Sequence, residues 1–370
     1  MGMSIAVCVA TPFQALNAIN LVCNSLTKND RKVLFYRDYS AESHSILLGI
    51  KKYHIFDCIY EYDLERKDNI FKYIINDVVQ AVNPLMFVKW ITKAHVDLHK
   101  ESFDKITITS GTELEVALAR IYPTASIIAY DDGLGSYVGD IVHDHKLNII
   151  WKLLGRRTDS IWPECLYVNN VEFCDSKLSK NKKKLLALEN TKDNYSSMVY
   201  DIFGVSNSSV YDSRHLVYLS QPLGELGANM DRYEDLIENA LNEFKEFGIY
   251  RKHPRDSRKT MLEFIQDDSN CIWELICGDR VDNNSVLIAC CSTTQIMPKI
   301  LYNKEPWIIF TYKIYGIDKT EFYKTRFYPV ITRLRSCYTN KYRIVEPASI
   351  EELVKDIREI LEKERLPQSP

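Results

Sequence analysis

Short apolar runs alternate with longer segments of helical periodicity along most of the chain. In the first half, runs rich in β-branched and aromatic residues lie at 4–10, 32–36, 55–60, 105–110 and 126–130. Between the first two runs, apolar residues recur at the spacing of one helix face: Phe13, Leu16, Ile19, Val22 and Leu26. Buried strands that alternate with helices are typical of βαβ units in a parallel sheet. We therefore expect residues 1–155 to form a doubly wound, Rossmann-like α/β domain.

A second series of apolar runs follows a polar stretch that shows no buried-strand pattern. We interpret residues 156–212 as a linker region, because GRRTDS, KNKKK and VSNSSVYDS lack apolar periodicity. In residues 213–370, strands are expected at 216–220, 248–254, 271–276, 285–291, 307–312 and 342–345. Helices are expected at 231–247, 259–266, 293–302 and 349–364, the last with the capping-box pair Ser349 and Glu352. This pattern predicts a second Rossmann-like domain that ends in a helix.

Length and charge agree with two ordinary globular domains. The chain has 370 residues, and about 150 residues per domain is a useful guide. Hydrophobic residues make up 46% and charged residues 26%, as in most soluble globular proteins. Because 47 basic residues are balanced by 50 acidic ones, no overall field attracts a polyanion, and we expect no nucleic-acid partner.

The ten cysteines are spread along the chain, most of them inside apolar runs. None forms a CxxC pair or has zinc-finger spacing, which favours reduced, buried thiols over disulfides or structural zinc. No apolar run approaches the roughly 18 to 20 residues of a membrane-spanning helix, and the N-terminus does not resemble a signal peptide. These features predict a cytoplasmic protein.

Asp131, Asp132 and Gly133 directly follow the predicted strand at 126–130. The carboxyl end of a parallel strand is where such sheets present catalytic side chains. Two adjacent carboxylates raise one another's pKa, which suits a general base, and Gly133 allows a tight turn. An ordinary acidic turn has the same sequence, so this motif alone does not decide between the two interpretations.

Two further polar motifs follow predicted strands of the second domain. Arg251, His253 and Pro254 lie in a cluster of cations that suits a phosphate group, although a solvated strand end has a similar composition. Ser292 and Thr293 lead from a buried strand into a helix, where hydroxyl groups cap the helix and can also help to bind an anion.

Together, in this order, the three motifs resemble those of bacterial sialyltransferases: an acidic D/E-D/E-G, an H-P and a Ser-Ser/Thr pair. The surrounding sequence is most similar to glycosyltransferase family 52, the lipooligosaccharide and capsule sialyltransferases. That similarity includes Thr11 and Gln14 of the TPFQ stretch and Gln221 after LVYLS. The resemblance extends from residue 5 to about residue 345.

The resemblance implies a GT-B architecture, in which two Rossmann-like domains face a central cleft. It also implies an inverting transfer of sialic acid from CMP-sialic acid to a surface glycan that ends in galactose. It implies Asp131 as general base with Asp132 in support, and His253 as acid or phosphate stabiliser. Residues expected at the donor are Gly133, Pro254, Ser292, Thr293, Gln221 and Arg251, and those expected on the acceptor side are Thr11, Gln14 and His143. No metal or other cofactor is expected, because histidine, cations and a helix N-terminus can neutralise the phosphate, although the alternative that Asp131 and Asp132 hold a metal stays open. A homodimer is also implied.

Two alternatives remain open at this stage. One is a glycosyltransferase of the same fold that uses a UDP-hexose, and the other is a non-catalytic nucleotide-binding protein.

The mixed apolar and basic stretch 151–157 fits either peripheral contact with the anionic inner membrane or packing on the linker. The pairs His95 with His99 and His143 with His145 lack a third metal ligand in the sequence pattern.

Overall fold

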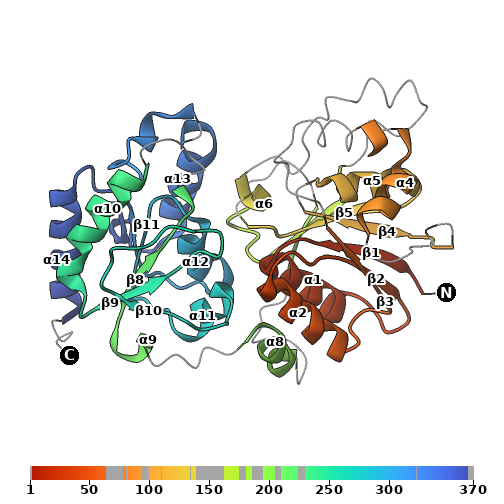
Figure 1. Ribbon diagram of the computed structural model, residues 1–370, viewed down its shortest axis with the longest axis horizontal. Helices are drawn as coiled ribbons and strands as arrows, with labels where there is room; N and C mark the ends of the chain where they lie inside the picture. Colours follow the sequence, from red (N-terminus) through yellow and green to blue (C-terminus); the bar gives the residue numbers. More distant parts are fainter. Residues whose placement is uncertain are drawn as a thin grey trace. The chain divides into compact units, whose positions relative to one another are not determined.

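The computed structural model describes residues 2–63, 78–92, 98–138, 162–174, 181–185, 195–204, 210–223 and 230–365, except for positions 81, 99, 110, 134 and 322. The chain divides into two compact units, Met1–Phe203 and Gly204–Pro370. Each unit contains its own parallel sheet with helices around it (Figure 1). The predicted α/β class is therefore confirmed for both halves of the chain.

The first domain is built on a seven-stranded sheet in which every neighbouring pair is parallel. Its strands are β1 (Ser4–Val9), β2 (Arg31–Arg37), β3 (Cys58–Tyr62), β4 (Lys105–Ile108), β5 (Ser126–Tyr130), β6 (Cys165–Val168) and β7 (Lys182–Lys184). Their order is β3-β2-β1-β4-β5-β6-β7, so the chain reverses its direction of travel across the sheet between β1 and β4. The loops after these two strands therefore meet at a topological switch point, where open α/β sheets bind ligands.

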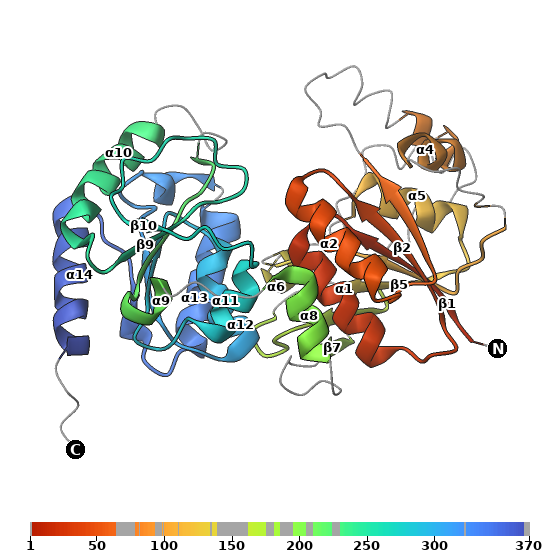
Figure 2. The same cartoon turned by 60° about the horizontal axis from the view of Figure 1, so that its bottom comes forward.

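Helices cover both faces of this sheet (Figure 2). They are α1 (Pro12–Ser25), α2 (Ala41–Lys52), α4 (Pro84–Ile91), α5 (Glu113–Ile121), the short α6 (Gly135–Val138) and α8 (Tyr195–Phe203). The starts of four of them are set by capping side chains: Thr11 accepts a hydrogen bond from Gln14 N, Asn83 accepts one from Met86 N, and Ser40 and Thr112 each form a capping box. The caps at Thr11, Ser40 and Thr112 fix where the loops after β1, β2 and β4 end.

The second domain has a six-stranded parallel sheet with the order β10-β9-β8-β11-β12-β13. Its strands are β8 (Leu216–Leu219), β9 (Gly248–Arg251), β10 (Ile265–Gln266), β11 (Val286–Ala289), β12 (Trp307–Phe310) and β13 (Ile344–Val345). The switch point lies between β8 and β11, because the chain runs outward from β8 through β9 to β10 and then returns to β11.

Most helices of the second domain connect these strands, while the first precedes β8 and the last follows β13. The helices are α9 (Val210–Ser213), α10 (Met230–Leu241), α11 (Trp273–Asp279), α12 (Met297–Tyr302), α13 (Tyr328–Cys337) and α14 (Ile350–Arg365). Short helical turns lie at Asn242–Phe244, Thr293–Ile296, Ile317–Lys319, Tyr323–Phe327 and Lys341–Arg343. The predicted cap of the last helix is confirmed, because Ser349 Oγ accepts a hydrogen bond from Glu352 N at 3.2 Å.

The predicted linker over 156–212 is wrong. This region supplies β6 and β7, which extend the first sheet beyond β5, and α8, which packs on α2. The first domain consequently extends to Phe203 rather than to residue 155. The pattern missed these strands because they are only four and three residues long, and the lysines of β7 lie on a sheet edge where charged side chains are favoured.

Two other predicted elements of the second domain also differ in the structure. Residues 271–276, expected as a strand, belong mostly to α11, in which Trp273, Leu275, Ile276 and Cys277 are buried. A short, mostly apolar run is compatible with a buried helix as well as with a strand. Residues 259–266, expected as a helix, are irregular and end in β10.

All ten cysteines are free thiols, and seven of them are buried, as expected from their apolar surroundings. In the described part of the chain, no helix is long and apolar enough to cross a membrane.

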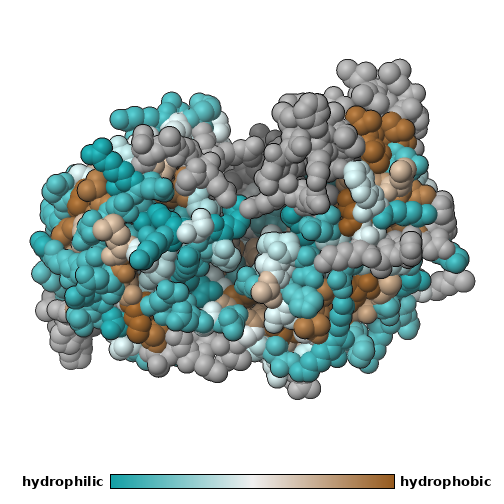
Figure 3. Space-filling model, viewed as in Figure 1, coloured by the Kyte–Doolittle hydropathy of each residue, from teal (hydrophilic) through white to brown (hydrophobic). Residues whose placement is uncertain are grey.

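A patch of exposed apolar residues lies over α4 and the residues just before it (Figure 3), and it includes Val82, Met86 and Trp90. The opposite face of the same helix buries Phe87 and Val88.

Candidate functional site

The predicted residues of the first domain gather at the carboxyl edge of its sheet. Thr11 and Gln14 follow β1, Thr109 follows β4, and Asp131 and Asp132 follow β5. Direct hydrogen bonds join these loops, because Gln14 Nε2 donates both to Thr109 Oγ1 and to the carboxylate of Asp132. The switch point of the first sheet is thus a connected polar site.

Asp131 is fully buried and surrounded by hydrogen-bond donors. Its carboxylate accepts hydrogen bonds from Gly133 N at 2.9 Å, from Asn169 Nδ2 at 2.9 Å and from the Tyr137 hydroxyl. Burial raises the pKa of Asp131, while these hydrogen bonds act in the opposite direction. The side chain therefore ties the loop after β5 to β6, and it has no exposed surface for a substrate.

Asp132 has the more accessible carboxylate of the pair, since its side chain is only half-buried. Gln14 Nε2 donates to Asp132 Oδ1, and the backbone N–H of Asp132 donates to Ser136 Oγ at 2.8 Å. Gly133 has a φ of 95°, and a Cβ there would meet no atom within 4 Å, so its role is conformational: it lets the chain turn directly after the acid pair. The turn exposes one carboxylate and buries the other.

A third acid, which the sequence pattern did not single out, lies behind this pair. Glu115 of α5 accepts hydrogen bonds from Thr109 N, Thr109 Oγ1 and Thr112 N at 2.7–2.8 Å. Burial raises its pKa to about 7, against the effect of these hydrogen bonds, and the charge of Asp132 adds to the rise. The Thr112-x-x-Glu115 capping box was a signal in the sequence that would have identified this glutamate.

In the second domain, His253 lies after the carboxyl end of β9. Its backbone N–H donates to Ser220 Oγ at 2.8 Å, which joins the loops after β8 and β9. Its ring Nδ1 accepts a hydrogen bond from Arg255 N at 3.0 Å. Because Nδ1 accepts, the neutral ring carries its proton on Nε2, where it can donate to an anion. Pro254 lies in the turn between these two contacts.

Ser292 and Gln221 connect the loops at the switch point of the second sheet. Gln221 Oε1 accepts a hydrogen bond from Cys291 N at 2.8 Å, across the loops that follow β8 and β11. Ser292 Oγ accepts from Thr294 N at 3.3 Å and so caps the helical turn that begins at Thr293. The hydroxyl of Thr294 also contacts Ser292 Oγ. Three hydroxyl-bearing residues, Ser292, Thr293 and Thr294, are thus concentrated at this edge.

The structure gives Arg251 a different environment from the one expected for a donor-binding residue. Its guanidinium pairs with the buried carboxylate of Asp267 and donates to Cys271 O at 2.6 Å and to Ser269 Oγ at 3.3 Å. Arg251 also lies over the ring of Trp273. These contacts hold β9, the loop after β10 and α11 together and give Arg251 a structural role, while its contact with a donor stays a prediction.

The expected acceptor-side residue His143 and the stretch 151–157 lie outside the described residues, as do His95 and His99. In the part of the chain that the structure describes, no group of three or more His, Cys, Asp or Glu residues could hold a metal ion. The expectation that no metal is required stays a prediction.

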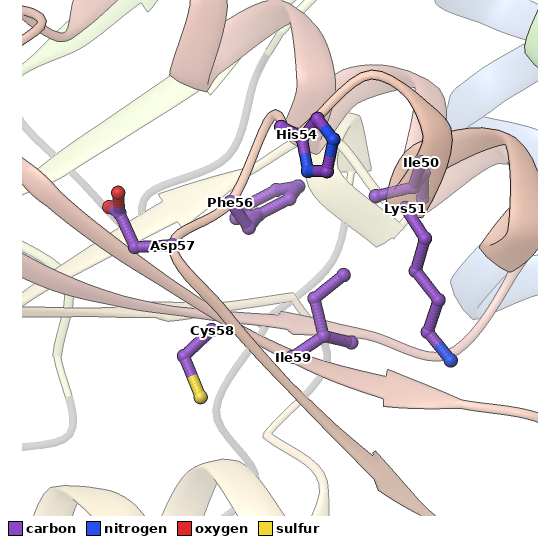
Figure 4. A pocket seen from close by; sticks show the side chains of 7 residues that line it. All are labelled: Ile50, Lys51, His54, Phe56, Asp57, Cys58 and Ile59. Atoms are coloured by element: carbon purple, nitrogen blue, oxygen red, sulfur yellow. The ribbon is translucent and has the colours of Figure 1, made fainter.

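A pocket of about 330 Å³ lies elsewhere in the first domain (Figure 4). Its lining combines apolar side chains with a few polar ones and comprises Ile50, Lys51, His54, Phe56, Asp57, Cys58 and Ile59. These residues lie at the end of α2 and the start of β3, which is the amino-terminal edge of the sheet. The pocket is therefore separate from the polar site at the carboxyl edge.

Neither a family model nor a curated protein sequence matches the chain, whereas solved structures do. The glycotransferase of kitacinnamycin matches with a TM-score of 0.58 and 10% identity, over 99% of this chain and 92% of its own. The spinosyn rhamnosyltransferase SpnG matches with a TM-score of 0.53 and 8% identity, over 97% and 91%. UGT71G1 of Medicago truncatula, solved with UDP-glucose, matches with a TM-score of 0.51 and 8% identity, over 97% and 90%.

These similarities extend over nearly the whole chain and over both sheets. They confirm the predicted fold class: the chain has the two-domain GT-B fold of glycosyltransferases. At about a tenth identity the likeness concerns the fold, and the chemistry has to be argued from the residues of this chain.

Proposed function

We propose that the protein is a glycosyltransferase, which moves a sugar from a nucleotide-sugar donor to a hydroxyl group of an acceptor. The observation that carries the proposal is the presence of a polar site at the switch point of each sheet. The site of the first domain presents a carboxylate, and that of the second presents a histidine with several hydroxyl groups. The GT-B fold supports the same function, since its solved relatives include named glycosyltransferases.

The reaction needs a base for the acceptor hydroxyl and groups that stabilise the departing phosphate. In this proposal Asp132 is the base, because its carboxylate is the accessible one of the pair. Asp131, which the family resemblance implies as base, instead holds the loop in place through its contacts with Tyr137 and Asn169.

The second-domain site is suited to receive the phosphate of the donor. Nε2–H of His253 and the hydroxyl groups of Ser292 and Thr293 are hydrogen-bond donors that can stabilise an anion. Gln221 contributes indirectly, because its side chain accepts from Cys291 N and so fixes the loop that presents Ser292. Attack from the face opposite the leaving nucleotide inverts the anomeric centre.

Two donors fit this chemistry. A UDP-hexose is favoured by the solved relatives, one of which was crystallised with UDP-glucose. CMP-sialic acid is favoured by the order of the three short motifs around Asp132, His253 and Ser292. An acceptor glycan, contact with the inner membrane and a homodimer stay predictions.

Direct assay of both donor classes tests the proposal. The purified protein is incubated in excess EDTA with lactose and either CMP-sialic acid or a set of UDP-hexoses, and the release of nucleotide is followed together with the glycosylated product. A product with one donor class identifies that donor and shows that no divalent metal is needed. Release of nucleotide without a glycosylated product would show that the protein uses the donor and that lactose is not its acceptor.

If the assay is negative, the melting temperature of the protein is measured with CMP and with UDP to find the reason. A shift with CMP alone or with UDP alone identifies the nucleotide and directs the search to other acceptors. If broad acceptor mixtures then give no turnover although a nucleotide binds, the proposed transferase function is wrong and a nucleotide-binding protein remains.

A further inference from the structure

We propose that Gln14, Thr109 and Glu115 form a positioning relay that orients the carboxylate of Asp132 for proton abstraction. The inference rests on the proposed function, since it assumes that Asp132 is the base. It assigns a role to Gln14, Thr109 and Glu115, which all lie outside the three sequence motifs. None of the three relay residues needs to touch the substrate.

The relay is a continuous chain of hydrogen bonds between two carboxylates. Glu115 Oε1 accepts from Thr109 Oγ1 at 2.8 Å, Thr109 Oγ1 accepts from Gln14 Nε2 at 3.2 Å, and Gln14 Nε2 donates its second hydrogen to Asp132 Oδ1. It connects α5, the end of β4, α1 and the loop after β5. Gln14, Thr109 and Glu115 are each no more than 3% exposed, so water does not compete for these bonds.

The direction of each hydrogen bond in the relay is determined by the groups at the two ends of the relay, Glu115 and the Gln14 amide. Glu115 takes hydrogen bonds from three donors, among them the Thr109 hydroxyl, whose hydrogen therefore points at the glutamate. The oxygen of that hydroxyl is then available as an acceptor for Gln14.

The Gln14 amide is held in one of its two orientations. Its Oε1 accepts a hydrogen bond from Ala10 N at 2.6 Å, so a flipped amide would place two N–H groups against each other. Its remaining N–H must then point at Asp132. An oriented, buried donor thus fixes the position of one oxygen of the half-buried carboxylate.

Replacement of Thr109 tests the relay, because valine keeps the shape and removes the hydroxyl. We expect Thr109→Val to lower kcat by about 10- to 100-fold, the cost of a misplaced catalytic group, with less than a threefold change in the KM of the donor. Thr109→Ser keeps the hydroxyl and should retain activity. The matched control is Thr107→Val, because Thr107 is also buried on β4 and also hydrogen-bonds, to Cys8 N at 3.0 Å, but has no link to Asp132.

The outcomes separate failure of the relay from failure of the proposed function. If Asp132→Asn is inactive while Thr109→Val behaves like Thr107→Val, the relay is wrong and the base assignment stands. If Asp132→Asn keeps full activity, the base assignment itself is wrong. A crystal structure of Thr109→Val provides a readout that needs no turnover: the relay predicts a displaced Gln14 amide, and an unchanged contact between Gln14 and Asp132 overturns it.

Discussion

Two neighbouring residues of the same type have opposite environments in this protein. Asp131 is buried among Tyr137, Gly133 and Asn169, whereas Asp132 is half-buried and bound by Gln14. Buried carboxylates with several protein donors stabilise a fold, while a base needs a path to its substrate. The two acids are therefore expected to respond differently to the same substitution.

Asp132→Asn should lower kcat by about 10²- to 10⁴-fold, the usual contribution of a general base, with little change in stability. Asp131→Asn should instead lower the free energy of unfolding by about 1–3 kcal/mol, because its amide would face the donors that now bind a carboxylate. Steady-state kinetics and urea denaturation of both variants check this. A stable but inactive Asp131→Asn together with an active Asp132→Asn would restore Asp131 as the base.

Arg251 provides a prediction about stability alone. Arg251→Met leaves the buried carboxylate of Asp267 without its cationic partner and should cost about 3–5 kcal/mol in the free energy of unfolding. Arg280→Met, which breaks the more exposed pair with Asp212, should cost less than about 1 kcal/mol. Chemical denaturation compares the two, and equal losses would contradict the structural role of Arg251.

At the scale of single elements, the start of α5 combines a capping function with the candidate site. Glu115 completes the capping box with Thr112 and also binds Thr109 at the end of β4. Because burial raises its pKa to about 7, above the value of about 4.3 for an unfolded glutamate, the folded protein binds more protons than the unfolded chain between these pH values.

The contribution of Glu115 to stability should therefore decrease as the pH rises from about 4.5 to 7. Glu115→Gln removes this titration, so its unfolding free energy should depend less on pH in that range than that of the wild type. Urea denaturation at several pH values measures the two slopes. Glu164→Gln, at an exposed position, serves as control and should keep the wild-type slope; identical slopes for all three proteins would contradict the prediction.

Strand β9, which carries the loop of His253, depends on a close contact at Gly248. A Cβ at Gly248 would lie 2.3 Å from ring atoms of the buried Phe264. Gly248→Ala should therefore lower the free energy of unfolding by about 1–3 kcal/mol through overpacking. Gly135→Ala meets no atom within 4 Å and should change stability by less than about 0.5 kcal/mol in the same urea titration. Similar effects for both variants would show that Phe264 can move aside.

At the scale of the whole molecule, each of the two units has its own sheet and its own buried core. The division falls between Phe203 and Gly204, and the candidate residues are shared between the units, with Asp132 in the first and His253 and Ser292 in the second. A protein built in this way is expected to show two unfolding transitions.

Calorimetry should resolve these transitions and assign them. Arg251→Met and Gly248→Ala should lower one transition only, that of residues 204–370. A nucleotide at about 100 times its Kd should raise the same transition by about 5–10 °C, since binding then contributes about 2.7 kcal/mol. A nucleotide that raises only the other transition would contradict the placement of the donor phosphate in the second domain.

The sequence by itself determined the central strands of both sheets and the class of the fold. Apolar runs located the strands of both sheets that are central in the core, and the periodicity and caps located α1 and α14, because burial of one face and satisfaction of helix ends are local requirements. It also placed Asp131, Asp132, His253 and Ser292 after strands, at the edge where parallel sheets bind ligands.

Only the tertiary structure decided how these residues are used. Gln14 meets Thr109 and Asp132 across 95 and 118 residues of sequence, and Arg251 meets Asp267 because β9 and β10 are neighbours. The short strands β6 and β7 and the helix α11 likewise form in response to surfaces made elsewhere in the chain. Periodicity reports which face of an element is buried, whereas the order of strands in a sheet decides which polar groups meet, and that order is not a local property.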